Sequence, residues 1–212
     1  MRKLIYDLET IADPKVLEFL PPVEANKSLK NPEKIAEDIA KKKVKQIEEL
    51  GLDKTTCLVC CVSMMDVDKK EPFHILLDPD LNEKILLDKF WEIASEYDRF
   101  ISFNGIPFDA PILTFRSMVN RVQPSVTISI KKYQITNHID LRMILGDWDK
   151  YAKGTLDFYA KILGVEGKTE GLDGSLVQQM WDCGCYQEIT DYCDQDVLAT
   201  RRLYERMNGY YF

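Results

Sequence analysis

The stretch Leu4-Ile5-Tyr6-Asp7-Leu8-Glu9 sets two carboxylates into a short apolar run near the start of the chain. Its apolar residues alternate, and this pattern predicts a buried strand. Because side chains two apart on a strand share a face, Asp7 and Glu9 would lie together, opposite Leu4, Tyr6 and Leu8. The two acids would be about 6.6 to 7 Å apart at the backbone, near enough to share a divalent cation. The alternative is an exposed strand end with both acids solvated.

The C-terminal sequence from Glu188 to Met207 predicts a long helix, because apolar residues recur near helical spacing and Asn208-Gly209 follows as a stop signal. Tyr192 and Asp196 would stand four residues apart on one face of this helix, about 6 Å apart along its axis. A phenol and a carboxylate would therefore point into the same space.

A third acid lies between these two ends. Residues 100–113 read as an apolar strand, a Gly/Pro turn and a helix whose first turn accommodates Pro111. This segment supplies Asp109 and the polar Asn104. Asp109 has a competing interpretation as the N-cap of that helix.

These three segments resemble, in order, the motifs of the DEDD 3'-5' exonucleases in the tyrosine-bearing subgroup: Asp7-x-Glu9, Asn104-Gly105-x-x-Phe108-Asp109 and Tyr192-x-x-x-Asp196. The run Tyr192-Cys193-x-x-Asp196-Val197 is similar to the exonuclease module of family B DNA polymerases and to its stand-alone relatives (DnaQ-like superfamily). Residues 138–141 and 164–174 also resemble stretches of the stand-alone proteins. The histidine-bearing subgroup places histidine one residue before Tyr192, where this chain has Asp191.

The resemblance implies the ribonuclease H-like fold, an α/β architecture with helices on both faces of a mixed five-stranded sheet. The order of the predicted elements agrees with it. Strands are predicted at 4–9, 56–66, 73–77, 99–103 and 134–139, and helices at 82–97, 111–119 and 155–163. We expect a single exonuclease domain over residues 1–212, in which residues 11–55 form a helical insertion over the active site.

The resemblance also implies a two-metal-ion hydrolysis of the terminal phosphodiester, with Asp7, Glu9, Asp109, Tyr192 and Asp196 as catalytic residues. One ion would be held by Asp7, Glu9 and Asp196; the second would be bridged by Asp7 and held through water by Asp109. Hard oxygen ligands favour Mg²⁺, with Mn²⁺ as a substitute. A phenol with a pKa of about 10 is a poor general base at neutral pH, so Tyr192 is expected to orient the attacking water.

Four residues are expected to contact the substrate: Thr10, Asn104, Phe108 and Lys168. Thr10 directly follows the paired acids, so its backbone would meet the terminal nucleotide, unless it is an ordinary strand-end residue. Asn104 would help to position that nucleotide, and Phe108 would stack on its base. Lys168 belongs to a loop that the resemblance places beside the substrate groove, where it would meet a phosphate.

The formal net charge of −7 argues against a protein that coats duplex nucleic acid through a broadly basic surface. Binding is expected to be confined to a cleft and to the strand terminus. The dense basic run is Lys41-Lys42-Lys43-Val44-Lys45, inside a helix predicted at 32–50. This run is either a solvated face with acidic partners or a phosphate-tracking arm beside the cleft.

The six cysteines favour reduced thiols in a reducing compartment. Cys57-x-x-Cys60-Cys61 lies in a predicted core strand, and Cys183-Gly184-Cys185 lacks the second pair of ligands that a zinc site needs. No apolar stretch approaches the roughly 18 residues of a membrane span, so we expect a soluble, intracellular protein of the cytoplasm with no membrane partner.

The leading hypothesis is a metal-dependent 3'-5' exonuclease acting on single-stranded DNA ends in replication, repair or mobile-element biology. A 3' exoribonuclease is an alternative, because no residue pattern reads the 2'-hydroxyl. A non-catalytic nucleic-acid-binding module is the alternative from another class, although the intact acids count against it. A polymerase or repair partner is left open.

Overall fold

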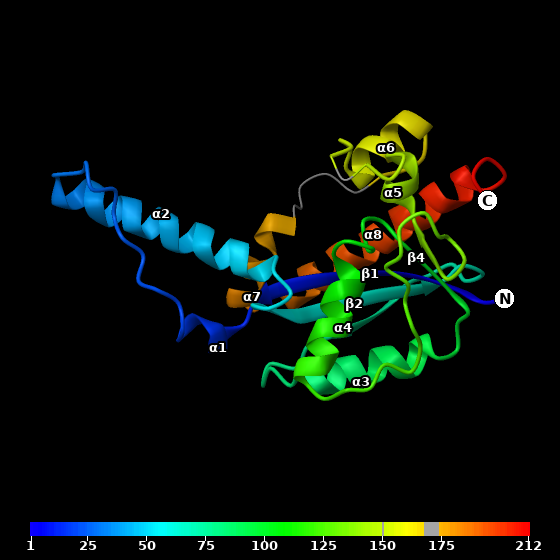
Figure 1. Cartoon of the computed structure of the whole chain (residues 1–212), viewed down its shortest axis with the longest axis horizontal. Helices are drawn as coiled ribbons and strands as arrows, with labels where there is room; N and C mark the ends of the chain where they lie inside the picture. The colour runs from blue at the N-terminus through cyan, green and yellow to red at the C-terminus, as the bar shows by residue number, and fades with distance from the viewer. Residues whose placement is uncertain (150, 168–173) are drawn as a thin grey trace.

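A computed structural model describes residues 1–149, 151–167 and 174–212, and all structural statements concern these residues. One mixed sheet has the strand order β3-β2-β1-β4-β5, as the fold class predicted (Figure 1). Its strands are β1 (Lys3–Ala12), β2 (Cys57–Asp66), β3 (Phe73–Leu76), β4 (Arg99–Ser102) and β5 (His138–Asp140). The α-helices are α1 (Pro14–Leu17), α2 (Pro32–Gly51), α3 (Glu83–Ala94), α4 (Asp109–Val119), α5 (Leu141–Leu145), α6 (Leu156–Leu163), α7 (Val177–Asp182) and α8 (Tyr186–Met207); a 3₁₀ turn, η1, spans Gly174–Leu176.

The central strand β1 pairs differently with its two neighbours. It runs antiparallel to β2 over its whole length, from Leu4 opposite Asp66 to Ala12 opposite Cys57. Its parallel pairing with β4 covers only Lys3 to Ile5. Strand β4 ends at Ser102, one residue beyond the partner of Ile5, so within the described residues the half of β1 that carries the acids has no paired strand on that side.

Alternation along β1 places its apolar residues in two core clusters, as the sequence predicts. Leu4, Tyr6 and Leu8 are buried with residues of α3 and α4. Ile5 is buried with residues of α5, α6 and the C-terminal half of α8. Each large side chain buried in this way stabilises the fold by about 1.5 to 3 kcal/mol, so the alternation fixes which face of β1 each acid occupies.

A β-bulge follows the second acid. Glu9 lies opposite Cys61 and Thr10 opposite Val59, so Cys60 has no residue across from it on β1. A bulge bends the strand and increases its twist at that point, and such irregularities are common beside active sites. The pairing then continues to Ala12, three residues beyond the predicted end of the strand.

The segment after β1, which we expected to form a helical insertion, is built around one long helix. Its long helix α2 projects away from the sheet, and only its last turn meets β1 (Figure 1). At that turn the Thr10 hydroxyl donates a hydrogen bond of 2.6 Å to the carbonyl of Gly51. The reason is compositional: Leu50 and Gly51 are the buried residues of α2, and the rest of the helix has too little apolar surface to cover the sheet.

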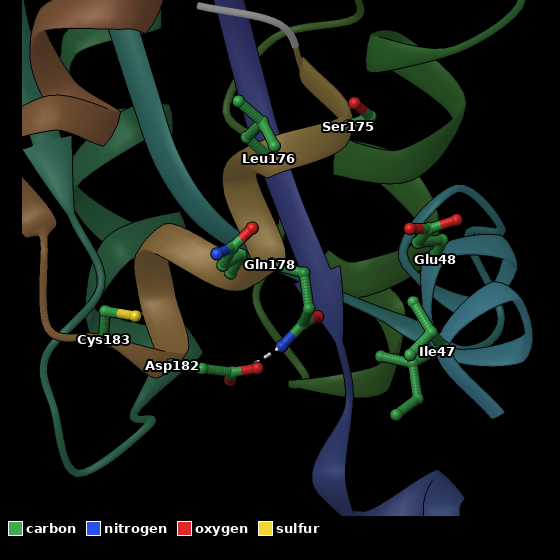
Figure 2. A pocket seen from close by; sticks show the side chains of 9 residues that line it. Ile47, Glu48, Ser175, Leu176, Gln178, Asp182 and Cys183 are labelled. Carbon is green, nitrogen blue, oxygen red and sulfur yellow. Dashed lines mark hydrogen bonds between the residues drawn. The ribbon is translucent and has the colours of Figure 1, made fainter. Parts of the chain in front are cut away.

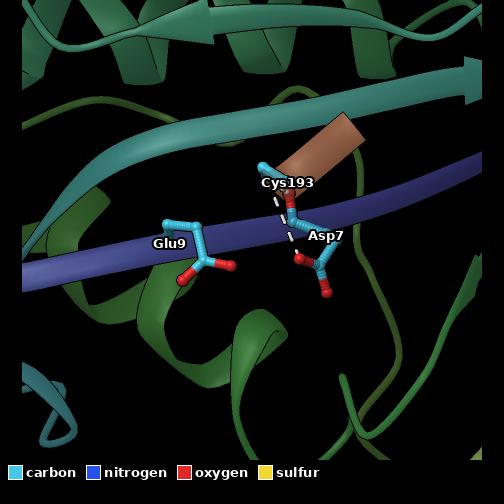
Figure 3. A group of neighbouring side chains, drawn as sticks. All are labelled: Asp7, Glu9 and Cys193. Carbon is cyan, nitrogen blue, oxygen red and sulfur yellow. Dashed lines mark hydrogen bonds between the residues drawn. The ribbon is translucent and has the colours of Figure 1, made fainter. Parts of the chain in front are cut away.

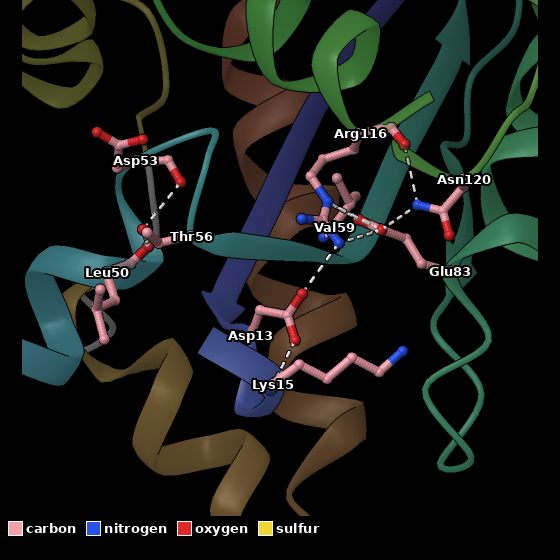
Figure 4. Close-up of polar contacts among 9 residues, drawn as sticks. All are labelled: Asp13, Lys15, Leu50, Asp53, Thr56, Val59, Glu83, Arg116 and Asn120. Carbon is pink, nitrogen blue, oxygen red and sulfur yellow. Dashed lines mark hydrogen bonds and ion pairs between the residues drawn. The ribbon is translucent and has the colours of Figure 1, made fainter. Parts of the chain in front are cut away.

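A buried ion-pair network joins α4 to the end of β1, near the base of helix α2, which we call the arm (Figure 4). Arg116 on α4 contacts Glu83 at 2.7 Å and Asp13, just after β1, at 3.2 Å. Asn120 also donates to Glu83 at 2.6 Å, and the Asp13 amide donates to the carbonyl of Thr56 at 2.8 Å. Removing one partner of such a buried pair costs about 3 to 5 kcal/mol, so the network sets the position of α4 relative to β1.

Several predicted elements begin at other residues than expected, among them α8, which begins at Tyr186 and not at Glu188. The strand predicted at 134–139 is the short β5 from His138 to Asp140, because pairing with β4 selects these residues. The helix predicted from Pro111 begins at Asp109. Within the described ranges, no helix combines the length and the apolar character needed to cross a bilayer.

Candidate active site

Asp7 and Glu9 lie side by side on β1, and α8 brings the Cys193 thiol against them (Figure 3). One ligand atom from each of these three residues lies within 4.8 Å of the others. Two half-buried carboxylates this close repel each other unless a proton or a cation neutralises them. Their oxygens are the donors that Mg²⁺ and Mn²⁺ prefer, so the donor set fits a hard divalent cation.

The Cys193 thiol contacts both the backbone and the side chain of Asp7. Its Sγ lies 3.6 Å from the Asp7 carbonyl oxygen and 3.7 Å from Asp7 Oδ2, so the S–H can donate to either. Burial, reinforced by the neighbouring Cys61, raises the pKa of Cys193 well above its usual range. A protonated thiol is a weak donor and a poor metal ligand, so Cys193 holds Asp7 in place. Sequence reasoning assigned Cys193 no role of its own, since its contact with the other end of the chain leaves no local signal.

Asp109 is the first residue of α4 and is almost completely buried. Desolvation above all, and then the charges of Asp140 and Asp196, raise the pKa of its carboxyl to about 8. The helix N-cap is Phe108, not Asp109, so the capping interpretation of Asp109 is wrong. Below about pH 8, the metal-free protein therefore keeps a proton on Asp109. A bound cation would compete with that proton.

Asp7 and Asp196 line one cavity of about 570 Å³, next to the part of β1 that β4 does not pair with. Asn104, Arg142 and Lys153 line the same cavity. Two cationic side chains thus stand beside two carboxylates, an arrangement suited to a phosphate that approaches bound cations. Neither Arg142 nor Lys153 was a sequence-based candidate, because a single basic residue carries no pattern of its own.

Tyr192 stands one turn before Asp196 on α8 and is nearly buried. Its hydroxyl faces the backbone of Gly174, where an added Cβ would lie 3.4 Å from the phenolic oxygen. Helix α8 contains both Tyr192 and Asp196, so their four-residue helical spacing is present, but Tyr192 does not line the cavity of Asp7 and Asp196.

The turn after β4 is shaped by Asp140, at the end of β5. The amides of Asn104 and Ile106 donate to the two oxygens of Asp140, each at 2.9 Å. Asn104 adopts the left-handed conformation with φ of 73°, and its Oδ1 accepts from Arg142 at 3.0 Å. A Cβ on Gly105 would collide with the Ser102 hydroxyl and lie 3.0 Å from Asp109 Oδ2. Sequence reasoning assigned no role to Asp140, although an acid between a strand and a helix is a visible capping signal.

The other substrate-binding candidates lie elsewhere. Thr10 lines a separate cavity of about 210 Å³ with Gly51 and Gly174. Phe108 is half-buried and lines another, of about 380 Å³, between α4 and the turn after α2. Neither residue lines the cavity of Asp7 and Asp196. Lys168 lies outside the described residues.

Comparisons with known proteins agree with the fold. Residues 52–211 match the family model described as a predicted 3'-5' exonuclease related to the exonuclease domain of PolB. This range includes Asp109, Tyr192 and Asp196, whereas Asp7 and Glu9 precede it. No curated protein matches the chain.

A solved structure extends the likeness to β1. The chain is similar to the family B DNA polymerase of the hyperthermophilic archaeon Pyrobaculum calidifontis, with a TM-score of 0.65 and 17% identity over 98% of this chain. The chain spans 24% of that polymerase, and at this identity the likeness shows the fold alone. The family match extends over most of the chain, so the protein belongs to the family of predicted 3'-5' exonucleases related to the exonuclease domain of PolB.

Proposed function

We propose that this protein removes nucleotides from the 3' end of single-stranded DNA, using divalent cations held by Asp7, Glu9, Asp109 and Asp196. One observation carries the proposal. Asp7 from the first strand and Asp196 from the last helix line a single cavity that Arg142 and Lys153 also enter. Acids alone would repel a phosphodiester, and cations alone would not bind metal; the combination suits metal-assisted phosphoryl transfer.

Each residue has a role that follows from its position. Bound Mg²⁺ would activate a water and stabilise the charge on the leaving 3' oxygen. Tyr192, in the tyrosine-bearing subgroup, would orient the attacking water through its hydroxyl. Arg142 and Lys153 would attract and position the phosphate, and Asn104, held by Arg142, would contact the terminal nucleotide. Phe108 and Thr10 line other cavities, so they would contact parts of the substrate other than the reacting phosphate.

Digestion of 5'-labelled strands tests this function. Single-stranded DNA and RNA of the same sequence are incubated with Mg²⁺, with Mn²⁺ or with chelator. We expect a ladder of DNA products shortened from the 3' end, no cleavage in chelator, and slower digestion of blunt duplexes, whose ends must first fray at a cost of a few kcal/mol.

Two substrates separate this proposal from its alternatives. A 3' phosphate should block digestion strongly, and closed circular single-stranded DNA should survive. Cleavage of the circle would indicate an endonuclease. Faster digestion of RNA than of DNA would favour an exoribonuclease, and no cleavage under any condition would favour a non-catalytic binding module.

A further inference from the structure

Two adjoining cavities form one groove between the arm helix α2 and the segment 174–183. The outer cavity, of about 370 Å³, has Val44 on one wall and Leu176 and Gln179 on the other. The inner cavity, of about 210 Å³, extends to Thr10 and Gly174. The two share Ile47, Glu48, Ser175 and Gln178, and we call them together the arm groove. Figure 2 shows Ile47 and Glu48 on α2 across from Leu176 and Gln178.

The inner end of the arm groove lies beside two residues of the candidate active site, Glu9 and Tyr192. Thr10 follows Glu9 on β1, and Gly174 faces the Tyr192 hydroxyl. Both walls are fastened to β1: the Ala12 amide donates to Gln178 Oε1 at 2.8 Å, and Thr10 donates to the carbonyl of Gly51 at 2.6 Å. The groove is therefore already formed, and its inner end lies next to Glu9 and Tyr192, although it is lined by other residues than the cavity of Asp7 and Asp196.

The outer end of the arm groove meets the basic run of α2. Lys41 lies one turn beyond Val44 on the same side of the helix and is exposed. The Lys45 side chain is 74% exposed and 3.6 Å from Glu49, an exposed pair that holds its ammonium group only weakly. The family match begins at residue 52, so the whole of α2 precedes it.

We propose that the arm groove binds the unpaired nucleotides that precede the 3'-terminal one, an inference that rests on the proposed exonuclease function. Their bases would lie against Val44, Ile47 and Leu176, and their phosphates would run past Lys41 and Lys45. From Gly51 to Val44 the helix rises about 10 Å, which matches about three stacked nucleotides.

The polar groups of the groove suit bases better than an apolar peptide. The exposed amide of Gln179 can donate to or accept from a base edge, and Glu48 and Asp182 can accept from base amino groups. Two carboxylates inside a groove would disfavour a purely apolar helix from a partner protein. They would also keep the phosphates outside, on the lysine side.

Removal of the two lysine charges tests the path of the strand. In Lys41→Gln/Lys45→Gln, we expect kcat/KM on a single-stranded dodecanucleotide to fall about tenfold, chiefly through KM, with a weaker salt dependence. The rate on a dinucleotide, which is too short to reach the groove, should stay unchanged. The matched control is Lys69→Gln/Lys70→Gln in the exposed turn after β2, at the opposite end of β1 from Thr10.

Alkylation of Cys183 locates the strand directly. This exposed thiol lines the outer cavity, whereas Cys57, Cys60, Cys61 and Cys193 are buried. In the inactive Asp7→Ala protein with Mg²⁺, the dodecanucleotide should slow iodoacetamide labelling of Cys183 about fivefold or more, and the dinucleotide should not. Fragmentation of the labelled peptide in the mass spectrometer separates the rate at Cys183 from that at Cys185, which is only partly buried.

The outcomes distinguish this inference from the proposed function. If the wild-type protein cleaves neither substrate, the exonuclease proposal fails. The groove proposal alone is overturned if the wild-type protein cleaves both substrates, the lysine variant keeps the ratio of the two rates, and the dodecanucleotide does not slow the labelling of Cys183. Protection of Cys183 that grows with protein concentration in the absence of DNA would instead make the groove an interface between copies of this chain.

Discussion

Asp7 meets a different partner on each side: Glu9 along the strand, the Cys193 thiol beneath it and the cavity that it shares with Asp196. Its replacement by alanine removes an acid that we assign to both cations and relieves repulsion among carboxylates. We expect Asp7→Ala to lower nuclease activity about a thousandfold or more, while the melting temperature of the metal-free protein stays the same or rises.

The control for this change is Asp191→Ala, which removes the same charge from an exposed position on α8. Asp191 accepts a hydrogen bond from Gln187 at 2.8 Å, on the helix surface, so its loss should affect neither activity nor melting. Equal activity of Asp7→Ala and Asp191→Ala would exclude Asp7 from the reaction.

Tyr192 offers a separate test, because its hydroxyl can be removed with little change in shape. If the phenol orients water and does not bind metal, Tyr192→Phe should lower kcat roughly 10- to 1000-fold and leave the metal dissociation constant unchanged. Steady-state kinetics and calorimetric titration with Mn²⁺ measure the two quantities. A tenfold loss of metal affinity would instead assign the phenol to the metal shell.

Among the elements, the turn after β4 depends on one glycine. A Cβ on Gly105 would collide with the Ser102 hydroxyl and press on Asp109 Oδ2, 3.0 Å away. Gly105→Ala should therefore destabilise the fold by about 1 to 3 kcal/mol and displace Asp109, with loss of activity. At Gly51 an added Cβ would meet backbone atoms at 3.7 Å, so urea unfolding of Gly51→Ala should show a change within about 0.5 kcal/mol. Similar midpoints for the two variants would mean that the turn can relax.

At the scale of the whole molecule, the proton on Asp109 links stability to pH. The carboxyl has a pKa of about 4 in the unfolded chain. In the folded, metal-free protein, burial and then the charges of Asp140 and Asp196 raise that pKa to about 8. Between these values the folded protein retains a proton that the unfolded chain has released, so the free energy of unfolding falls as pH rises.

Asp109→Asn cannot titrate, so its free energy of unfolding should fall less than that of the wild type between about pH 5 and pH 8. Urea unfolding in chelator at several pH values measures both slopes, and all other groups are common to the two proteins. Parallel slopes would mean that Asp109 is already ionised in the folded protein.

Local patterns in the sequence determined which segments form strands and helices and which side chains share a face of each. Period-two alternation put Tyr6 on one side of β1 and Asp7 on the other, and the helical period placed Tyr192 and Asp196 on one face of α8. The Thr155 N-cap and the Gly164 C-cap of α6 likewise follow from residue type, since a side-chain acceptor and a left-handed φ are local requirements.

Only the tertiary structure decided what each acid contacts and where the arm lies. Cys193 reaches Asp7, and Asp140 shapes the turn at Asn104, because the sheet brings distant segments together. The limits of β5 depend on its pairing with β4, and the base of α2 is tied to β1 by the hydrogen bond from Thr10 to Gly51. A sequence records the intrinsic preferences of neighbouring residues, whereas these contacts arise from packing between segments far apart in the chain, which no local period encodes.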